Sequence, residues 1–241
     1  NIAYRNDSNA PSGTSRTVTL TNVRDSGGTL NSGINTTTVN AASIVTLVPV
    51  NDAPTLSGGP YVITSTNENT TSSAVSVSTV LAGASYADAD AGAASGIAVI
   101  ATVGRGTWEY STDGTTWTAF GTVSTSSALL LTSSSQVRYI PDNANGENVS
   151  FTYRAWDRTS GAASTNGSPN TGDTTFNGSS TAYSTGSAQA TLVVTSVNDA
   201  PVVTPVNPSL TGISDTATNN SGDAVSSLLG GVTDADTGAI K

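Results

Sequence analysis

The sequence contains no cysteine, no histidine and no methionine. Without cysteine, disulfide bonds and thiolate metal sites are excluded. Without histidine, the chain has neither the usual general base nor the commonest ligand of transition metals. These absences exclude a catalytic triad of the serine–histidine or cysteine–histidine kind, and we expect a protein that is not an enzyme.

Strong helix formers and long apolar runs are scarce as well. The chain has three glutamates and a single lysine, and aromatic residues make up 5% of it. Threonine, serine, glycine, asparagine and valine dominate, which favours short strands joined by turns. No apolar run approaches the ~20 residues of a membrane-spanning helix, and the N-terminus has no basic region followed by an apolar one. We predict an all-β chain without membrane insertion.

The charge is strongly one-sided, with a formal net charge of −9 and a pI near 4.1. Such a balance disfavours nucleic acid as a partner and favours multivalent cations. Most of the acidic residues are aspartates that recur within short motifs. The pattern therefore indicates cation binding at particular places.

The chain repeats itself. The segment Val-Asn-Asp-Ala-Pro at 50–54 returns at 197–201, 147 residues later, and the Asp-Ala-Asp of 88–90 returns at 234–236, 146 residues later. A register that holds to within one residue over some forty positions is typical of tandem domains. Asn1 stands where a starting methionine would be, and we interpret both ends, Asn1 and Lys241, as cuts through a longer polypeptide.

The repeat divides the chain into three parts. We expect the back half of one repeat, then a whole repeat, then the front half of a third, at residues 1–50, 51–198 and 199–241 respectively. The proline of each Asn-Asp-Ala-Pro linker biases the preceding alanine towards an extended conformation, so successive domains should stack end to end. We call the linkers at 51–54 and 198–201 the first and second junctions.

The whole repeat shows seven strand-like segments separated by turn signals, the pattern of an antiparallel Greek-key β-sandwich. They are 61–64, 97–100, 106–110, 128–131, 136–140, 149–154 and 190–194. Trp108 and Trp156 lie in these segments and are expected in the core, whereas Trp117 is expected to be exposed. The serine- and threonine-rich stretch 160–187 is expected to be a long surface loop or extended hairpin with weak order.

The recurring acids suit calcium, which takes about 6–8 oxygen ligands. Each junction combines an aspartate from the end of the upstream domain, the Asn-Asp pair of the linker and the Asp-Ala-Asp of the downstream domain. These candidate ligands are Asp25, Asn51, Asp52, Asp88 and Asp90 at the first junction, and Asp157, Asn198, Asp199, Asp234 and Asp236 at the second. In an extended backbone the two aspartates of Asp-Ala-Asp would point to the same side and could converge on one ion.

These motifs resemble a known family. The linker is similar to the Asn-Asp-x-Ala-Pro linker of cadherin ectodomains, and Asp-Ala-Asp is similar to their Asp-x-Asp calcium motif. The closer resemblance is to bacterial cadherin-like tandem repeats of giant secreted or cell-surface adhesins, carried by 23–28, 110–114, 137–142 and 153–157. It implies cadherin-like sandwiches in a calcium-rigidified extracellular array for adhesion, biofilm or a surface filament.

The resemblance is incomplete on the upstream side of a junction. The linker here is one residue shorter, and the Asp-Arg-Glu motif of cadherins has no clean counterpart, since Asp157-Arg158 is followed by threonine. For a carboxylate at the domain edge, Glu68 is the candidate at the first junction, and Asp215 is its nearest analogue at the second.

Other interpretations stay open. The Asn-Asp pair could form only a turn with an Asx hydrogen bond. The sandwich could be a carbohydrate-binding module, which would need a pair of exposed aromatic side chains on the middle domain. The two half repeats could also dock onto neighbouring subunits of a filament by strand exchange. Calcium ions, neighbouring repeats or copies of the chain, and a cell-surface protein or glycan are the expected partners.

Overall fold

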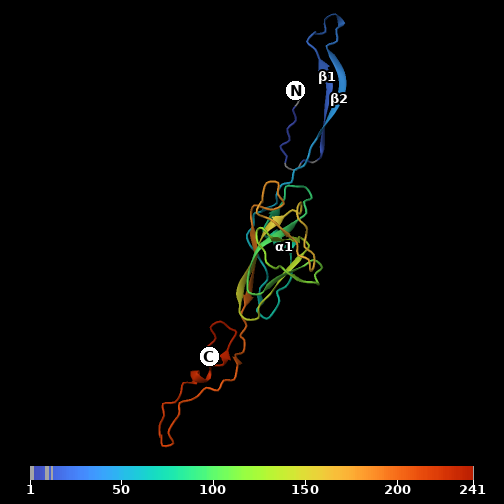
Figure 1. Cartoon of the computed structure of the whole chain (residues 1–241). Coiled ribbons are helices and arrows are strands. Elements are labelled where there is room, and N and C mark those ends of the chain that lie inside the picture. Colours follow the sequence, from blue (N-terminus) through green and yellow to red (C-terminus); the bar gives the residue numbers. More distant parts are fainter. Residues whose placement is uncertain (1–2, 9–10, 12, 241) are drawn as a thin grey trace.

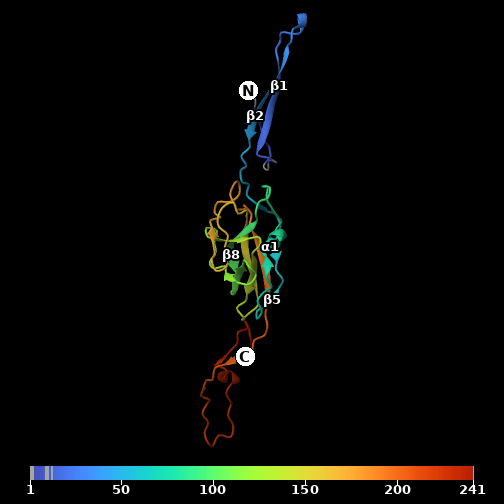
Figure 2. The same cartoon turned by 90° about the vertical axis from the view of Figure 1, so that its right-hand side faces the viewer.

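The computed structural model describes residues 3–8, 11 and 13–240, and it is elongated (Figure 1). A two-stranded hairpin lies at one end, a β-sandwich in the middle and an extended segment at the other end, as both views show (Figures 1 and 2). The hairpin consists of β1 (Ser15–Arg24) and β2 (Thr36–Thr46), with a 3-10 turn, η1 (Leu30–Ser32), at its tip. The end segment carries β16 (Val202–Val203), η2 (Val225–Leu228) and β17 (Val232–Thr233).

The middle part consists of two packed sheets and one short helix. The larger sheet has the order β14-β11-β8-β13-β15-β4, with β5 also paired to β15, and the smaller one has the order β10-β9-β12-β6. Their bounds are β4 Tyr61–Val62, β5 Thr66–Asn67, β6 Val75–Ser76, β8 Gly96–Val103, β9 Thr107–Ser111, β10 Thr118–Ala119, β11 Ala128–Thr132, β12 Gln136–Ile140, β13 Glu147–Trp156, β14 Thr171–Gly172 and β15 Ala188–Thr195. The helix is α1 (Val77–Gly83), and β3 (Thr55–Leu56) pairs with β7 (Tyr86–Ala87) beside the linker.

The expected all-β architecture is confirmed, and each of the seven expected strands occurs, as β4, β8, β9, β11, β12, β13 and β15. The alternation of the sequence explains the burial. Along β13, the side chains of Val149, Phe151 and Tyr153 are buried while those between them are partly exposed. Strands of period 2 place one face on the core, which is why this pattern could be recognised.

Aromatic side chains join the two sheets. Trp108 of β9 packs edge-on against Phe151 of β13, with ring centroids 5.0 Å apart, and Phe120 packs edge-on against Phe151 at 5.7 Å. Trp108 and Trp156 are both buried, as expected. Trp117 is half-buried rather than exposed, because the guanidinium of Arg138 lies 4.0 Å from its ring.

One edge of the larger sheet is not antiparallel. β4 and β5 pair with β15 in parallel, and between them the Ile63 N–H donates to the Thr191 carbonyl over 2.8 Å. The first strand of the repeat therefore runs in the same direction as its last strand. Both lead towards the second junction.

The stretch 160–187 is folded, contrary to the expectation of weak order. Tyr183 and Ala182 pack with Trp156 and Leu130 into a second apolar cluster on the outer face of the larger sheet. Buried hydroxyls satisfy the backbone there, since Ser184 Oγ accepts from the Ala155 N–H over 2.9 Å. The stretch 160–187 is mostly polar in composition, so its sequence gives little sign of this packing. A few apolar side chains are enough to cover one face of the sheet.

Among the described residues there is no helix with the length and apolar character needed to span a lipid bilayer.

Two phenylalanines allow a matched test of the core. Phe151 is fully buried between the sheets, whereas Phe176 is 79% exposed. We expect Phe151→Ala to lower the free energy of unfolding by about 3–5 kcal/mol through lost burial and a residual cavity. Phe176→Ala should change it by less than about 0.5 kcal/mol. Urea denaturation followed by tryptophan fluorescence measures both, and equal effects would contradict this assignment of the core.

Candidate metal centre

Each linker is hydrogen-bonded to the Asp-Ala-Asp loop that follows it. The Asp52 N–H donates to a carboxylate oxygen of Asp90 over 2.8 Å, and the Asp199 N–H donates to Asp236 over the same distance. The pairing of β3 with β7 also returns as the pairing of β16 with β17. The same local structure thus occurs at both junctions.

The Asp-Ala-Asp segments are bends, not the extended backbone expected from their sequence. The Asp90 N–H donates to Asp88 Oδ1 over 2.9 Å, and Asp236 donates to Asp234 in the same way over 3.0 Å. These are Asx turns. The turn uses one oxygen of the first aspartate and leaves the second aspartate to face the linker.

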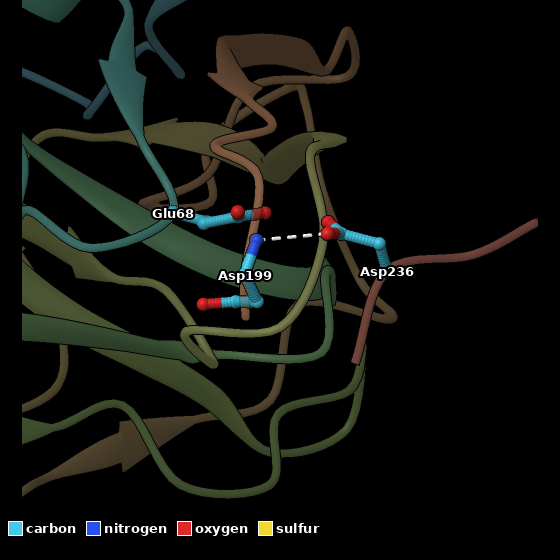
Figure 3. A group of neighbouring side chains, drawn as sticks. All are labelled: Glu68, Asp199 and Asp236. Atoms are coloured by element: carbon cyan, nitrogen blue, oxygen red, sulfur yellow. Dashed lines mark hydrogen bonds between the residues drawn. The ribbon is translucent and has the colours of Figure 1, made fainter. Parts of the chain in front are cut away.

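At the second junction three carboxylates come together. Glu68, Asp199 and Asp236 each offer an oxygen, and these oxygens lie within 4.8 Å of one another. Figure 3 shows the Glu68 and Asp236 carboxylates near the backbone nitrogen of Asp199, whose N–H points at Asp236. Such a group could hold a metal ion.

Two oxygens of this group are buried without a hydrogen-bond partner, namely Glu68 Oε2 and Asp199 Oδ2. Glu68 is 0% exposed. An unpaired buried charge is costly, and none of the ion pairs formed by the described residues involves these three side chains. The donor set fits a hard cation, which would supply the missing positive charge.

Glu68 lies at the second junction, whereas the sequence-based expectation placed it at the first. Its N–H donates to the Thr195 carbonyl over 3.0 Å, and its Oε1 accepts from the Val197 N–H over 2.6 Å. The parallel pairing of β5 with β15 causes this, because it carries Glu68 to the end of the repeat where the next linker begins.

Asp157 lies at the first junction, not the second. Its Oδ2 accepts from the Asn51 side chain over 2.9 Å, and it is only 2% exposed. β13 is antiparallel to β15, so the chain leaves β13 at the upstream end of the repeat. For the same reason Asp25, which follows β1, lies at the exposed far tip of the hairpin and not at the first junction.

The remaining candidates are distributed as follows. Asn51, Asp52, Asp88 and Asp90 are half-buried at the first junction, and Asp234 is half-buried beside Asp236 at the second. Asn198 is exposed and donates to the carbonyl of Asp199 over 3.0 Å. Asp215 is exposed and is not part of the three-carboxylate group. It stands 147 residues after Glu68, so its position corresponds to the downstream end of its own repeat.

The first junction encloses a cavity of about 600 Å³, lined by Asn51, Asp90 and Asp157 among others. Nearby, the Tyr86 hydroxyl donates to Asp88 over 3.3 Å. Burial raises the pKa of Tyr86 well above its usual value, and the charges of Asp88 and Asp157 raise it further. The first junction therefore also concentrates negative charge.

Asn145 takes part in the second junction but was not among the sequence-based candidates. Its Nδ2 donates to the Ala235 carbonyl over 3.0 Å, and its Oδ1 accepts from the Thr237 N–H over 2.7 Å. One amide side chain thus holds both ends of the Asp236 turn. Asn-Gly, as at 145–146, is an ordinary turn signal, and nothing in the sequence pattern ties it to residues some 90 positions away.

Comparisons with protein-family models, with curated proteins and with solved structures find no match for this chain.

The Asn145 contact can be tested without metal. We expect Asn145→Ala to remove both hydrogen bonds, each contributing about 0.5–1.5 kcal/mol, and so to speed amide exchange at Thr237 by about tenfold. Hydrogen–deuterium exchange of peptides covering 232–240, in a chelating buffer, measures this. Asn148→Ala is the control, because Asn148 is exposed on β13 near the same end. Unchanged exchange in Asn145→Ala would contradict the contact.

Proposed function

We propose that this chain is a calcium-binding structural segment of a bacterial extracellular or cell-surface protein, in which calcium stiffens the junctions between β-sandwich repeats. The observation that carries the proposal is the three-carboxylate group at the second junction, with two buried oxygens that have no partner. Adhesion or biofilm formation is the role implied by the resemblance to cadherin-like adhesin repeats.

The donor chemistry supports calcium over other metals. The side chains at the two junctions offer only carboxylate and amide oxygens, and the chain has no histidine or cysteine. Oxygen-only sites suit calcium and magnesium. Calcium accepts 6–8 ligands in irregular geometry, and a site assembled from a strand end, a linker and a bend is better matched to it than to the strict octahedron of magnesium.

The proposed mechanism is mechanical. Glu68 belongs to the middle repeat, whereas Asp236 belongs to the segment beyond the linker. Two unit charges within 4.8 Å of each other repel by on the order of 3 kcal/mol or more at an effective dielectric constant of about 20. Without a cation this repulsion opposes closure of the junction. A bound cation would attract both carboxylates, so the net interaction between the middle repeat and the segment beyond the linker would become favourable.

The structure gives the carbohydrate-binding alternative little support. Trp108 and Trp156 are buried, and Trp117 is covered by Arg138. Phe176 is the large exposed aromatic side chain of residues 51–198, all of which the structure describes. A sugar-binding platform would need a second exposed aromatic ring beside Phe176, and residues 51–198 do not supply one. The recurrence of Asp-Ala-Asp at two junctions likewise favours a structural role over a unique active site.

Calcium titration by calorimetry, with small-angle scattering in parallel, tests the proposal. We expect heat of binding, a longer and stiffer particle, and about 2.7 kcal/mol of added stability per site at a hundred times the dissociation constant. Glu68→Gln keeps the size of the side chain but removes its charge, so it should lose the binding of the second junction.

Glu109→Gln is the matched control, since Glu109 pairs with Arg138 on the smaller sheet and should leave binding unchanged. Magnesium at the same concentration is expected to bind more weakly. If neither heat nor shape responds to calcium, the acidic motifs serve only as turns.

A further inference from the structure

The exposed hairpin tip, Asp25–Asn35, is closed by the same kind of hydrogen bond as the longer segment that follows β13. The Asp25 N–H donates to the Asn35 carbonyl over 3.0 Å, as the Asp157 N–H donates to the Ala182 carbonyl over 3.1 Å. Asn35 and Ala182 are 147 residues apart, which is the spacing of the two linkers. In both places the aspartate Oδ1 accepts an N–H from two residues further on, at 2.9 and 2.8 Å.

In the middle repeat this structure holds the linker. Asp157 Oδ2 accepts from the Asn51 side chain over 2.9 Å, and the Ser179 carbonyl accepts from the Ala53 N–H over 2.7 Å. Ser179 has a positive φ of 54°, which turns its carbonyl towards the linker. The Asn51 side chain also donates to the Thr181 carbonyl over 3.1 Å and to the Ser180 carbonyl over 3.5 Å. The segment after β13 therefore holds the linker by one carboxylate and three backbone carbonyls.

At the hairpin tip the equivalent acceptors face solvent. Asp25 is exposed, and Ser32, 147 residues before Ser179, has the same left-handed backbone with φ 64°. Within the part of the chain that the structure describes, neither Asp25 Oδ2 nor the Ser32 carbonyl accepts a hydrogen bond. Among the described residues, the tip thus presents two acceptors of the kind that bind the first linker.

At the second linker, in contrast, hydrogen-bond donors are left without acceptors. The Asn198 side chain donates only to the carbonyl of the next residue, and the Ala200 N–H has no acceptor among the described residues. Both residues are exposed. Their counterparts Asn51 and Ala53 are bound by the segment after β13. The open donors of this linker complement the open acceptors of the tip.

We propose that the Asp25–Asn35 tip of one copy docks onto the 198–201 linker of a second copy, joining the chains head to tail. Asp25 then takes the place beside Asn198 that Asp157 takes beside Asn51. Because Asn51, Asp90 and Asp157 line one cavity, Asp25 also approaches Asp236. This last step rests on the proposed function, since it adds a fourth carboxylate to the metal centre.

Apolar side chains on the two parts complement each other in the same register. Ile63 and Leu192 of β15 are both buried in the core between the sheets. Leu210 and Val45 stand at the corresponding positions, each shifted by 147 residues. Leu210 is more than half exposed, and Val45 is half-buried. In the docked pair, the segment around Leu210 adds as a parallel strand to the edge of β2.

The contact is limited in extent. Residues 199–241 and 1–50 together contain no counterpart of the central strand β8. The joined halves therefore share one strand edge and the junction, not a complete sandwich. Association should be weak and depend on concentration, and a heterologous contact of this kind builds open chains.

Sedimentation velocity from micromolar to millimolar protein, with calcium present, tests the proposal. We expect the sedimentation coefficient of the unmodified chain to rise with concentration. The Asp25→Ala variant lacks the carboxylate acceptor of the tip, and the Asn198→Ala variant lacks the side-chain donor of the linker. Neither variant should therefore associate with itself. An equimolar mixture of the two variants keeps one intact contact and should form dimers and nothing larger. Asp7→Ala and Asn219→Ala, exposed residues outside the contact, should associate like the unmodified chain.

The docking proposal is overturned if the unmodified chain sediments as a monomer at every concentration. It is also overturned if the Asp25→Ala variant associates as strongly as the unmodified chain. Calorimetry on dilute monomer keeps the two proposals apart. Calcium binding without association overturns docking alone, and association without calcium binding overturns the proposed function alone.

Discussion

The hydrogen bond from the linker aspartate N–H to the second carboxylate of Asp-Ala-Asp is the interaction on which the rest of each junction depends. It is made twice, by Asp52 with Asp90 and by Asp199 with Asp236, at 2.8 Å in both cases. It fixes the linker to the downstream repeat and holds a carboxylate towards the upstream one. At the second junction this bond keeps Asp236 beside Asp199, so that Glu68, at the end of the preceding repeat, has two further carboxylates within reach. Charge is thereby concentrated at a place that a cation can stabilise.

The strands could be predicted from sequence because burial on one face imposes a period of two. The ends of the repeat could not. Glu68 and Asp157 were each placed at the wrong junction because sequence order does not reveal which way a strand runs. The parallel pairing of β5 carries Glu68 downstream, and the antiparallel turn from β13 returns Asp157 upstream. Both placements follow from long-range sheet topology, which the local sequence composition does not reveal.

The acidic motifs themselves were recognisable, but their conformation was not. Asp-Ala-Asp reads as extended, yet an Asx hydrogen bond between its two aspartates bends it. Asn145 escaped notice because Asn-Gly has an ordinary use in turns, and its contacts with Ala235 and Thr237 exist only once the two parts are stacked. The stretch 160–187 looked disordered because its packing depends on two side chains, Ala182 and Tyr183, covering Trp156.

The way each linker is attached gives the molecule a mechanical polarity. The first linker is fastened to the repeat that follows it, through Asp157, Ser179 and Asp90. At the second, the link back to the preceding repeat passes through Glu68 and Asn145. A pulling force along the long axis would therefore load the contacts of Glu68 and Asn145, which tie the second junction to the repeat before it. The joint beside the three-carboxylate group would then extend while the folded parts on either side of it remain intact.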